Sequence, residues 1–149
     1  FSFKNLFNSV SAYGIGSHRH IAEIDQELSK HSKRKINVFF TPHLIPMFRG
    51  ILSTIYIETK KKYKAELIYE TLKKYHKNNF FIKMAKFNQP IGTGDVMNTN
   101  YCKISVCKNR ITNKVIIIST LDNLVKGASG QAVQNMNIAH NLNETLGLK

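Results

Sequence analysis

The sequence predicts a compact domain in which helices and strands alternate along the chain. Its 149 residues are enough for one domain with a substantial buried core. Hydrophobic residues make up 42% of the chain, and nine Phe and six Tyr favour a globular protein over a disordered one. Apolar residues recur at helical spacing in some segments and alternate with polar residues in others. One folded domain of mixed α and β structure is therefore expected.

Helical periodicity marks several segments. Residues 17–32 carry Ile21, Ile24 and Leu28 at helical spacing, with acidic residues early and basic residues late, as the helix dipole prefers. A second amphipathic helix is predicted over 64–77, with lysines on its outer face. Its predicted inward-facing residues are Leu67, Ile68, Leu72 and Tyr75. The apolar positions of a last helix, after Gly130, are Ala132, Val133, Met136 and Ala139.

Runs rich in β-branched and aromatic residues predict the strands. These runs are 36–40, 51–59, 80–86, 101–107 and 115–120. The run 51–59 is partly apolar on both faces, which predicts a central place in the sheet. The nearly all-aliphatic run 115–120 suits a strand that is covered on both faces. Between the first two runs, Pro42 and Pro46 predict an irregular loop, because proline removes a donor and restricts the residue before it.

The net charge of +13 raises the question of nucleic-acid binding. Lysine far outnumbers arginine, however, and the lysines are spread along the chain, a bias that looks compositional. A basic nucleic-acid module is therefore a minor alternative, and no nucleic-acid partner is predicted. No apolar run approaches the roughly 20 residues of a membrane-spanning helix, so no membrane partner is predicted.

The cysteines and the first residue bear on where the protein works. Cys102 and Cys107 lie in an alternating run whose spacing puts them on opposite faces of a strand, which argues against a disulfide between them. Reduced thiols suit a cytoplasmic location. The chain begins at Phe1 with no visible signal peptide, and we expect it to be a piece of a longer protein.

The first candidate site is the block His18-Arg19-His20, at the predicted start of a helix. The partial positive charge at a helix N-terminus disfavours the imidazolium and leaves a neutral ring that can accept a proton. Such a ring suits a general base or an acid/base relay. Arg19 adds a planar fork of donors for a carboxylate or phosphate. The alternative is a polar helix start with two solvated histidines.

Two further segments are candidates. The double-proline loop 41–50 delivers His43 and Arg49, although Arg49 could instead pair with a surface acid. The stretch 127–130, Gly-Ala-Ser-Gly, precedes a helix and could present backbone N–H groups to an anion. Ordinary helix-start chemistry explains the same stretch equally well.

Several kinds of site are not predicted. A metal site would need convergent ligands that His43 and the histidine block do not supply, so no metal is predicted. No glycine-rich dinucleotide fingerprint follows a strand, and neither cysteine is placed as an activated nucleophile. The residues alone therefore indicate an anionic-substrate pocket. Its predicted members are His18, Arg19, His20 and Arg49.

Taken together, blocks along the whole chain resemble the N-acetyl-gamma-glutamyl-phosphate reductase family. The blocks are 11–20 with Glu23, 40–47 with 49–51, Thr93-Gly94 with 98–102, and 121–137. They follow the family's order, which makes chance a poor explanation. The family usually has a proline two residues after the second histidine, where this chain has Ile21-Ala22. Its absence loosens the predicted helix start without removing His20.

The resemblance implies an α+β fold of the kind found as the C-terminal domain of glyceraldehyde-3-phosphate and aspartate-semialdehyde dehydrogenases. This fold is a mixed, mostly antiparallel sheet with helices on one face. Residues 1–125 would form a substrate and catalytic domain that is incomplete without an upstream cysteine. Residues 126–149 would form a C-terminal helix that packs on an NADP-binding Rossmann domain outside this chain. The family's habit also implies a homo-oligomer, either a dimer or a tetramer.

The resemblance further implies an activity, the NADPH-dependent reduction of N-acetyl-glutamyl 5-phosphate to N-acetyl-glutamate 5-semialdehyde and phosphate in arginine biosynthesis. The upstream cysteine would attack the acyl phosphate, and hydride from NADPH would reduce the resulting thioester. His20 would be the acid/base partner. The residues implied to bind substrate are His18, Arg19, Tyr13 and Arg49, and those implied near the cofactor are Asn123, Gly127 and Gly130.

An isolated chain without the upstream half is expected to be inactive. The alternative is a stand-alone domain that binds an anion or substrate without catalysing a reaction.

Overall fold

The computed structural model describes residues 7–60 and 63–149. The chain divides into two compact units, Phe1–Phe48 and Arg49–Lys149. Each unit is described by itself. No helix in the described ranges is long and apolar enough to cross a membrane.

The described residues of the first unit form one helix and a small ribbon. Strand β1 (Ser11–Ala12) pairs antiparallel with β2 (His43–Leu44), so the predicted irregular loop contains a short strand. Helix α1 (His20–Ser32) begins at the second histidine of the block, and Lys33 ends it in the left-handed conformation, with φ 56°.

The predicted strand 36–40 does not form, and side chains of α1 explain why. Asp25 Oδ1 accepts the backbone N–H of Val38 at 2.8 Å, and Ser29 Oγ accepts that of Ile36 at 2.8 Å. Backbone donors that a strand would offer to a neighbouring strand are therefore satisfied by a helix packed beside them. The strand prediction here is wrong.

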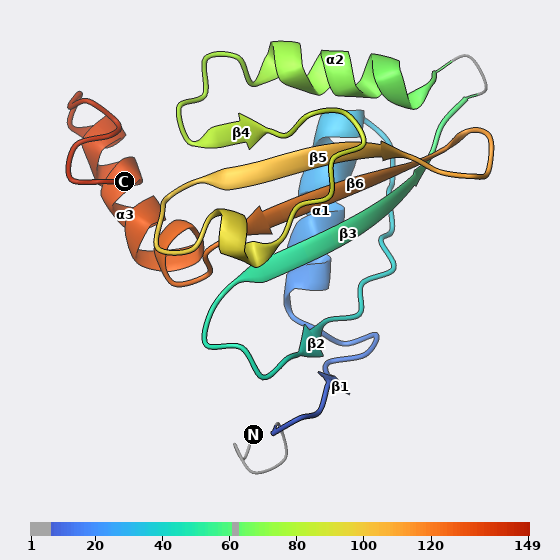
Figure 1. Ribbon diagram of the computed structural model, residues 1–149, viewed down its shortest axis with the longest axis horizontal. Coiled ribbons are helices and arrows are strands. Elements are labelled where there is room, and N and C mark those ends of the chain that lie inside the picture. Colours follow the sequence, from blue (N-terminus) through green and yellow to red (C-terminus); the bar gives the residue numbers. More distant parts are fainter. Residues whose placement is uncertain (1–6, 61–62) are drawn as a thin grey trace. The chain divides into compact units, whose positions relative to one another are not determined.

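The second unit is built on a four-stranded sheet (Figure 1). The strands, in spatial order, are β3 (Ile51–Glu58), β6 (Lys114–Leu121), β5 (Cys102–Lys108) and β4 (Ile82–Met84). The pairs β3–β6 and β6–β5 are antiparallel, whereas β4–β5 is parallel. The prediction of a mixed, mostly antiparallel sheet is confirmed. Strand β6 lies between β3 and β5 in the sheet.

Strand β3 lies at an edge of this sheet, so its predicted central place is wrong. The pattern misleads because apolar residues on both faces of a strand report on burial above and below it. An edge is decided by hydrogen bonding to neighbours, which is a long-range property. The apolar side chains of β3 stay partly exposed, and Tyr56 is 70% exposed.

Helix α2 (Ala65–Tyr75) lies against one face of the sheet (Figure 1). The core beneath it has Ala65, Val106 and Val115 fully buried at its centre. Its partly buried members are Ile57, Ile68, Tyr69, Leu72, Met84, Phe87 and Ile117. The helix therefore turns Ala65, Ile68, Tyr69 and Leu72 inward. Leu67 and Tyr75, which were predicted to face inward, are 50% and 76% exposed.

The end of the chain wraps around one more helix. A π-helical turn (Val125–Ser129), labelled η3, leads into α3 (Gly130–Ala139). The buried Asn137 donates from Nδ2 to the carbonyl oxygens of Glu144 at 3.3 Å and Leu146 at 2.9 Å. These bonds fold the residues after α3 back along the helix.

Candidate functional site

The histidine block of the first unit forms a ring cluster around His18. The ring centroid of His18 lies 5.4 Å from Tyr13, 4.8 Å from His20 and 5.3 Å from Phe40, all in edge-on arrangements. Gly14, with φ 57°, allows the chain to turn close to this ring, since a Cβ there would lie 3.1 Å from His18. The cluster brings together the predicted site residues Tyr13, His18 and His20.

A hydrogen bond joins the two histidines. The backbone N–H of His20 donates to Nδ1 of His18 at 3.2 Å. An accepting Nδ1 carries no proton, so the neutral His18 ring holds its proton on Nε2. This bond satisfies one of the free N–H groups at the start of α1. His18 therefore fixes the backbone from which the exposed His20 side chain projects.

Two other candidate residues of the first unit, Arg19 and His43, are less constrained. Arg19 is exposed and makes no hydrogen bond or ion pair with the described residues. His43 is also exposed, and its Nδ1 lies 3.1 Å from the carbonyl oxygen of Thr41. No group of three or more His, Cys, Asp and Glu side chains within residues 7–60 and 63–149 is arranged to hold a metal ion.

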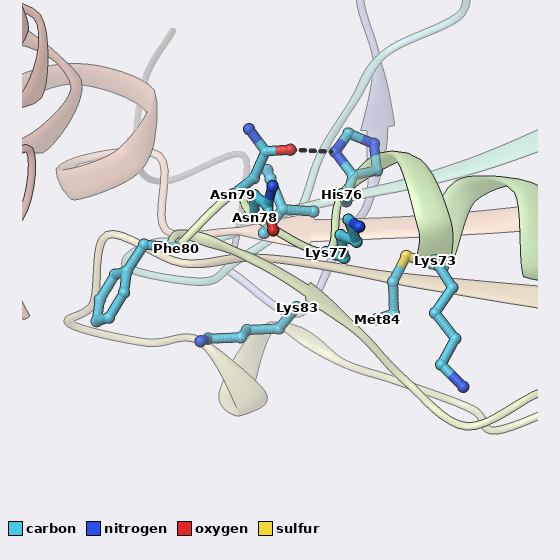
Figure 2. Close-up of a pocket in the computed structure, with 9 residues that line it drawn as sticks. Lys73, His76, Lys77, Asn78, Asn79, Phe80, Lys83 and Met84 are labelled. Carbon is cyan, nitrogen blue, oxygen red and sulfur yellow. Dashed lines mark hydrogen bonds between the residues drawn. The ribbon is translucent and has the colours of Figure 1, made fainter.

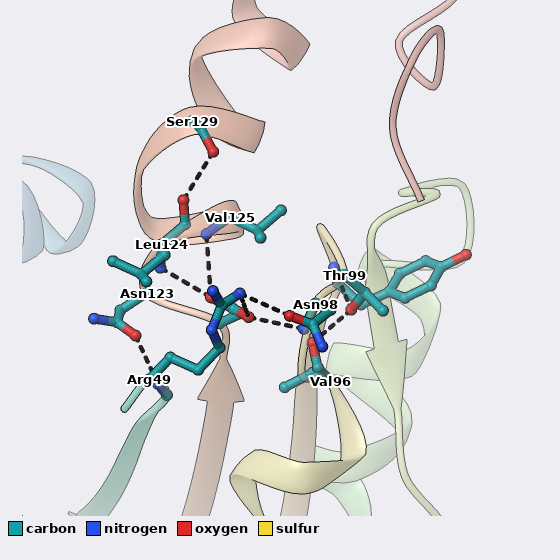
Figure 3. A network of polar contacts seen from close by, with 11 residues as sticks. Arg49, Val96, Asn98, Thr99, Asn123, Leu124, Val125 and Ser129 are labelled. Carbon is teal, nitrogen blue, oxygen red and sulfur yellow. Dashed lines mark hydrogen bonds and ion pairs between the residues drawn. The ribbon is translucent and has the colours of Figure 1, made fainter. Parts of the chain in front are cut away.

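In the second unit, Arg49 takes part in a polar network around Asp122 (Figure 3). Nη1 of Arg49 donates to Oδ2 of Asp122 at 3.1 Å and to Oδ1 of Asn98 at 2.8 Å. Asp122 follows the last strand and its side chain is fully buried. The partner of Arg49 is therefore a buried acid. The alternative offered by the sequence was a pair with a surface acid, without a role in a site.

Backbone donors complete the surroundings of Asp122. Its Oδ2 accepts the N–H of Asn98 at 2.8 Å, and its Oδ1 accepts those of Leu124 at 2.9 Å and Val125 at 3.2 Å. Burial raises the pKa of Asp122, but these N–H groups and Arg49 outweigh burial, so the net pKa lies below its ordinary value. The carboxylate is therefore held ionised.

Sequence reasoning did not single out Asp122 as a site residue. Its signal was present, because an acidic residue directly after a buried strand and before a helix start is rarely left unpaired. Its partner Arg49 lies 73 residues earlier, and spacing could not connect the two.

The residues predicted near the cofactor are placed around the same turn. Oδ1 of Asn123 accepts the backbone N–H of Gly50 at 2.6 Å. Gly127 is exposed, and Gly130 is buried against Val125 and Asn100. The N–H groups of Gly127, Ser129 and Gly130 already donate to carbonyl oxygens of residues 122, 124 and 125. These three donors are engaged within the turn, so the predicted anion nest is not formed by them.

One hollow of about 470 Å³ opens beside the C-terminal end of α2 (Figure 2). Its lining residues are Lys73, His76, Lys77, Asn78, Asn79, Phe80, Ile82, Lys83 and Met84. None of the predicted site residues lines it. The lysines of its wall are exposed, which is the ordinary state of a solvated basic surface. We assign no function to this hollow.

Comparison with known proteins identifies relatives of the chain. Residues 1–123 match the family described as "Semialdehyde dehydrogenase, dimerisation domain". An N-acetyl-gamma-glutamyl-phosphate reductase of Staphylococcus aureus (strain MRSA252) is 42% identical over 147 residues, which is 99% of this chain and 43% of that protein. One of Thermoanaerobacter pseudethanolicus (strain ATCC 33223 / 39E) is 44% identical, over 99% of this chain and 44% of that protein.

Solved structures show the same fold. An aspartate semialdehyde dehydrogenase from Francisella tularensis has a TM-score of 0.68 and 16% identity, over 91% of this chain and 40% of that one. An aspartate semialdehyde dehydrogenase II from Vibrio cholerae has a TM-score of 0.64 and 20% identity, over 83% and 37% of the two chains. At these identities the likeness supports the predicted dehydrogenase-type α+β fold alone.

The sequence and fold comparisons agree with each other and with the resemblance found in the motifs. The chain spans less than half the length of the curated relatives it matches. It is similar to N-acetyl-gamma-glutamyl-phosphate reductases over nearly all of its own length, and it belongs to the semialdehyde dehydrogenase dimerisation-domain family.

Proposed function

We propose that this chain is the substrate-side part of an NADPH-dependent N-acetyl-gamma-glutamyl-phosphate reductase. The observation that carries this proposal is the 42% and 44% identity to reductases over 99% of the chain. The identity includes the whole length in which the histidine block, Arg49 and Asp122 occur. In this proposal the protein converts N-acetyl-glutamyl 5-phosphate to the 5-semialdehyde and phosphate, and works as a homo-oligomer in the cytoplasm.

His20 is the proposed acid/base group. Its side chain is exposed at the first residue of α1, so it is accessible to a substrate. Acid/base assistance is needed because the attacking thiol must give up its proton. In the reduction, hydride transfer to the thioester carbon places negative charge on its oxygen, which a proton donor stabilises until the thiolate leaves and the aldehyde forms. The nucleophilic thiol belongs to a cysteine outside this chain. Cys102 is not a candidate, since it lies on β5 with Sγ 3.4 Å from Ser119 Oγ.

Four further residues are proposed to bind the substrate. His18 holds the backbone of His20 through Nδ1, which leaves its Nε2–H to donate to a substrate oxygen. Tyr13 packs on the same ring, and Arg19 is exposed next to it. Arg49 supplies a fixed positive charge in the second unit. An acyl phosphate with a free carboxylate carries the kinds of anionic group that an arginine side chain binds.

The three residues proposed near the cofactor, Asn123, Gly127 and Gly130, differ in how they could contact a nicotinamide group. Asn123 uses Oδ1 for Gly50, and its Nδ2 makes no hydrogen bond to the described residues, so it can donate to a carboxamide oxygen. Gly127 is exposed, so a ligand can reach its backbone. Gly130 is buried at the start of α3, so its proposed contribution to the cofactor site is the shape of the turn. NADPH would supply the hydride.

A coupled assay tests the proposal. NADPH formation from N-acetyl-glutamate 5-semialdehyde, phosphate and NADP is measured with this chain alone, and again after adding a separately expressed N-terminal half of the reductase. We expect activity only in the mixture. Silence in both samples would favour a domain that binds an anionic ligand without catalysis, and activity of the chain alone would contradict the proposed division of the site.

A further inference from the structure

The Arg49 side chain is held in an unusual way for an arginine beside a carboxylate. Such pairs are frequently bidentate, with two nitrogens of the guanidinium facing two oxygens of the acid. Here Arg49 reaches Asp122 through Nη1 alone, at 3.1 Å. The other oxygen of Asp122 is taken by the backbone N–H groups of Leu124 and Val125. The second half of a bidentate pair is therefore blocked.

Asn98 completes the hold on the same nitrogen. Its Oδ1 accepts from Nη1 of Arg49 at 2.8 Å, and its own backbone N–H donates to Asp122 Oδ2. Nη1 carries two hydrogens and has two acceptors, so its donor capacity is used. Asn98 has φ 61°, a conformation that Asn and Gly tolerate better than most residues. The turn is thus built to bring this amide to Arg49.

The opposite edge of the guanidinium is left open. Nε and Nη2 of Arg49 make no hydrogen bond to the described residues, and the side chain is 29% exposed. These two nitrogens point their N–H bonds in parallel, which is the geometry that receives two oxygens of a carboxylate or phosphate. Asp122 accepts hydrogen bonds from three backbone N–H groups as well as from Arg49. Its carboxylate therefore occupies only one of the guanidinium nitrogens, and Nε and Nη2 of Arg49 stay available to another anion.

We infer that Asp122 and Asn98 are positioning residues that fix Nη1 of Arg49, so that its Nε and Nη2 edge binds one oxyanion of the substrate in a bidentate manner. The oxyanion is a carboxylate or a phosphate, both of which the substrate carries. The inference rests on the proposed function only for the identity of that substrate. Asp122 and Asn98 fulfil this role without contacting the substrate.

The test measures equilibrium binding of two separate probes, N-acetylglutamate and inorganic phosphate, to the full-length protein that carries this chain. R49K keeps the charge but removes the fork, and N98G removes the amide while tolerating the positive φ. N113G is the matched control, because Asn113 also has a positive φ, 64°, and precedes the opposite end of β6. Isothermal titration gives Kd for each probe and variant.

We expect R49K to weaken binding of one probe by about tenfold and N98G to weaken the same probe by about three- to tenfold, since one charge-assisted hydrogen bond is lost or loosened. The other probe and the N113G control should keep their wild-type Kd. Weakened N-acetylglutamate identifies a carboxylate, and weakened phosphate identifies a phosphoryl group. The inference is overturned if the wild type binds neither probe, or if R49K and N98G bind both probes as the wild type does.

Reductase activity on the same samples separates this inference from the proposed function. Anion binding that depends on Arg49 and Asn98 in a protein without reductase activity would keep the inference and set aside the proposed reaction. In an active protein, N98G should raise KM for the substrate that carries the weakened anionic group. The factor should be similar to the change in Kd of the corresponding probe, and kcat should stay nearly unchanged. A loss of kcat with KM unchanged would contradict the positioning role.

Discussion

Asp122 shows how one residue couples stability to pH. It is buried, and its carboxylate accepts hydrogen bonds from Arg49 and three backbone N–H groups. Each of these donors would be left unsatisfied in the interior if the acceptor were lost. A residue with this role is expected to matter for folding as well as for the placement of Arg49.

The lowered pKa of Asp122 predicts the direction of its pH dependence. A carboxyl group with a folded-state pKa below its unfolded value stabilises the protein above the unfolded pKa and loses that effect as pH falls. We expect D122N to lower the free energy of unfolding by about 2 kcal/mol or more at pH 7, with the difference from wild type shrinking below about pH 4. Urea unfolding at several pH values measures this.

The matched control for Asp122 is E58Q. Glu58 pairs with Lys114 at 3.2 Å, but its side chain is 66% exposed, and exposed ion pairs contribute little. E58Q should change stability by less than about 0.5 kcal/mol across the same pH range. Equal losses for the two variants would contradict the role given to the buried network.

The proposed acid/base role of His20 predicts a loss of catalytic rate when its ring is removed. Replacing His20 by Asn keeps a polar side chain at the start of α1 but removes the imidazole ring that the proposed acid/base role needs. In the proposed reductase, with its N-terminal half added, H20N should lower kcat by about 10² to 10⁴, the usual effect of losing a positioned acid/base group. Steady-state kinetics decides the matter, and an unchanged kcat would move the acid/base role to His18.

The start of α3 is closely packed around Gly130. A Cβ added to Gly130 would lie 2.8 Å from Cγ1 and 2.9 Å from the carbonyl oxygen of Val125, and would also meet Oδ1 of Asn100. That oxygen is the one buried side-chain polar atom without a hydrogen bond in the described part of the chain. The glycine therefore allows η3, α3 and the segment before β5 to approach each other.

G130A should lower the free energy of unfolding by about 1–2 kcal/mol, because overpacking outweighs the better helix propensity of alanine. Gly127 provides the control, since a Cβ there would make only ordinary contacts at 3.5 Å or more. G127A should leave stability unchanged or slightly raised. Thermal unfolding of both variants measures the difference. A G130A variant as stable as the wild type would show that Val125 and Asn100 can move apart to make room for the methyl group.

Helix α2 offers a second test of packing with two leucines. Leu72 belongs to the core cluster, whereas Leu67 is 50% exposed on the same helix. L72A should cost about 2–3 kcal/mol in denaturant unfolding, and L67A less than about 1 kcal/mol. The reverse order would mean that the helix faces the sheet as the sequence pattern suggested, through Leu67 and Tyr75.

The net charge of +13 predicts how strongly the protein binds nucleic acids. The cations are distributed, and several are engaged by acids or aromatic rings, as Lys83 is by Phe80 and Tyr101. We expect weak binding to duplex DNA that disappears by physiological salt and shows no sequence preference. Fluorescence anisotropy over a salt series measures this, and sub-micromolar binding at 150 mM salt would contradict it.

The family, the mixed sheet, the helices and the candidate histidines could all be predicted from the amino-acid sequence. Periodicity reports local burial, and the motif blocks report descent, so α1, α2, β5 and β6 lie close to their predicted ranges. The histidine block was found because its residues are adjacent in the chain. Their ring cluster needed only one distant residue, Phe40.

Folding fixed the features that depend on residues far apart in sequence. It placed β3 at an edge, exchanged the predicted Leu67 and Tyr75 for Ala65 and Tyr69 on the inner face of α2, and satisfied the segment 36–40 with side chains of α1. It also joined Arg49 to Asp122 across 73 residues. Hydrogen-bond partners and helix rotation are set by the lowest free energy of the whole packed unit, and no local pattern encodes them.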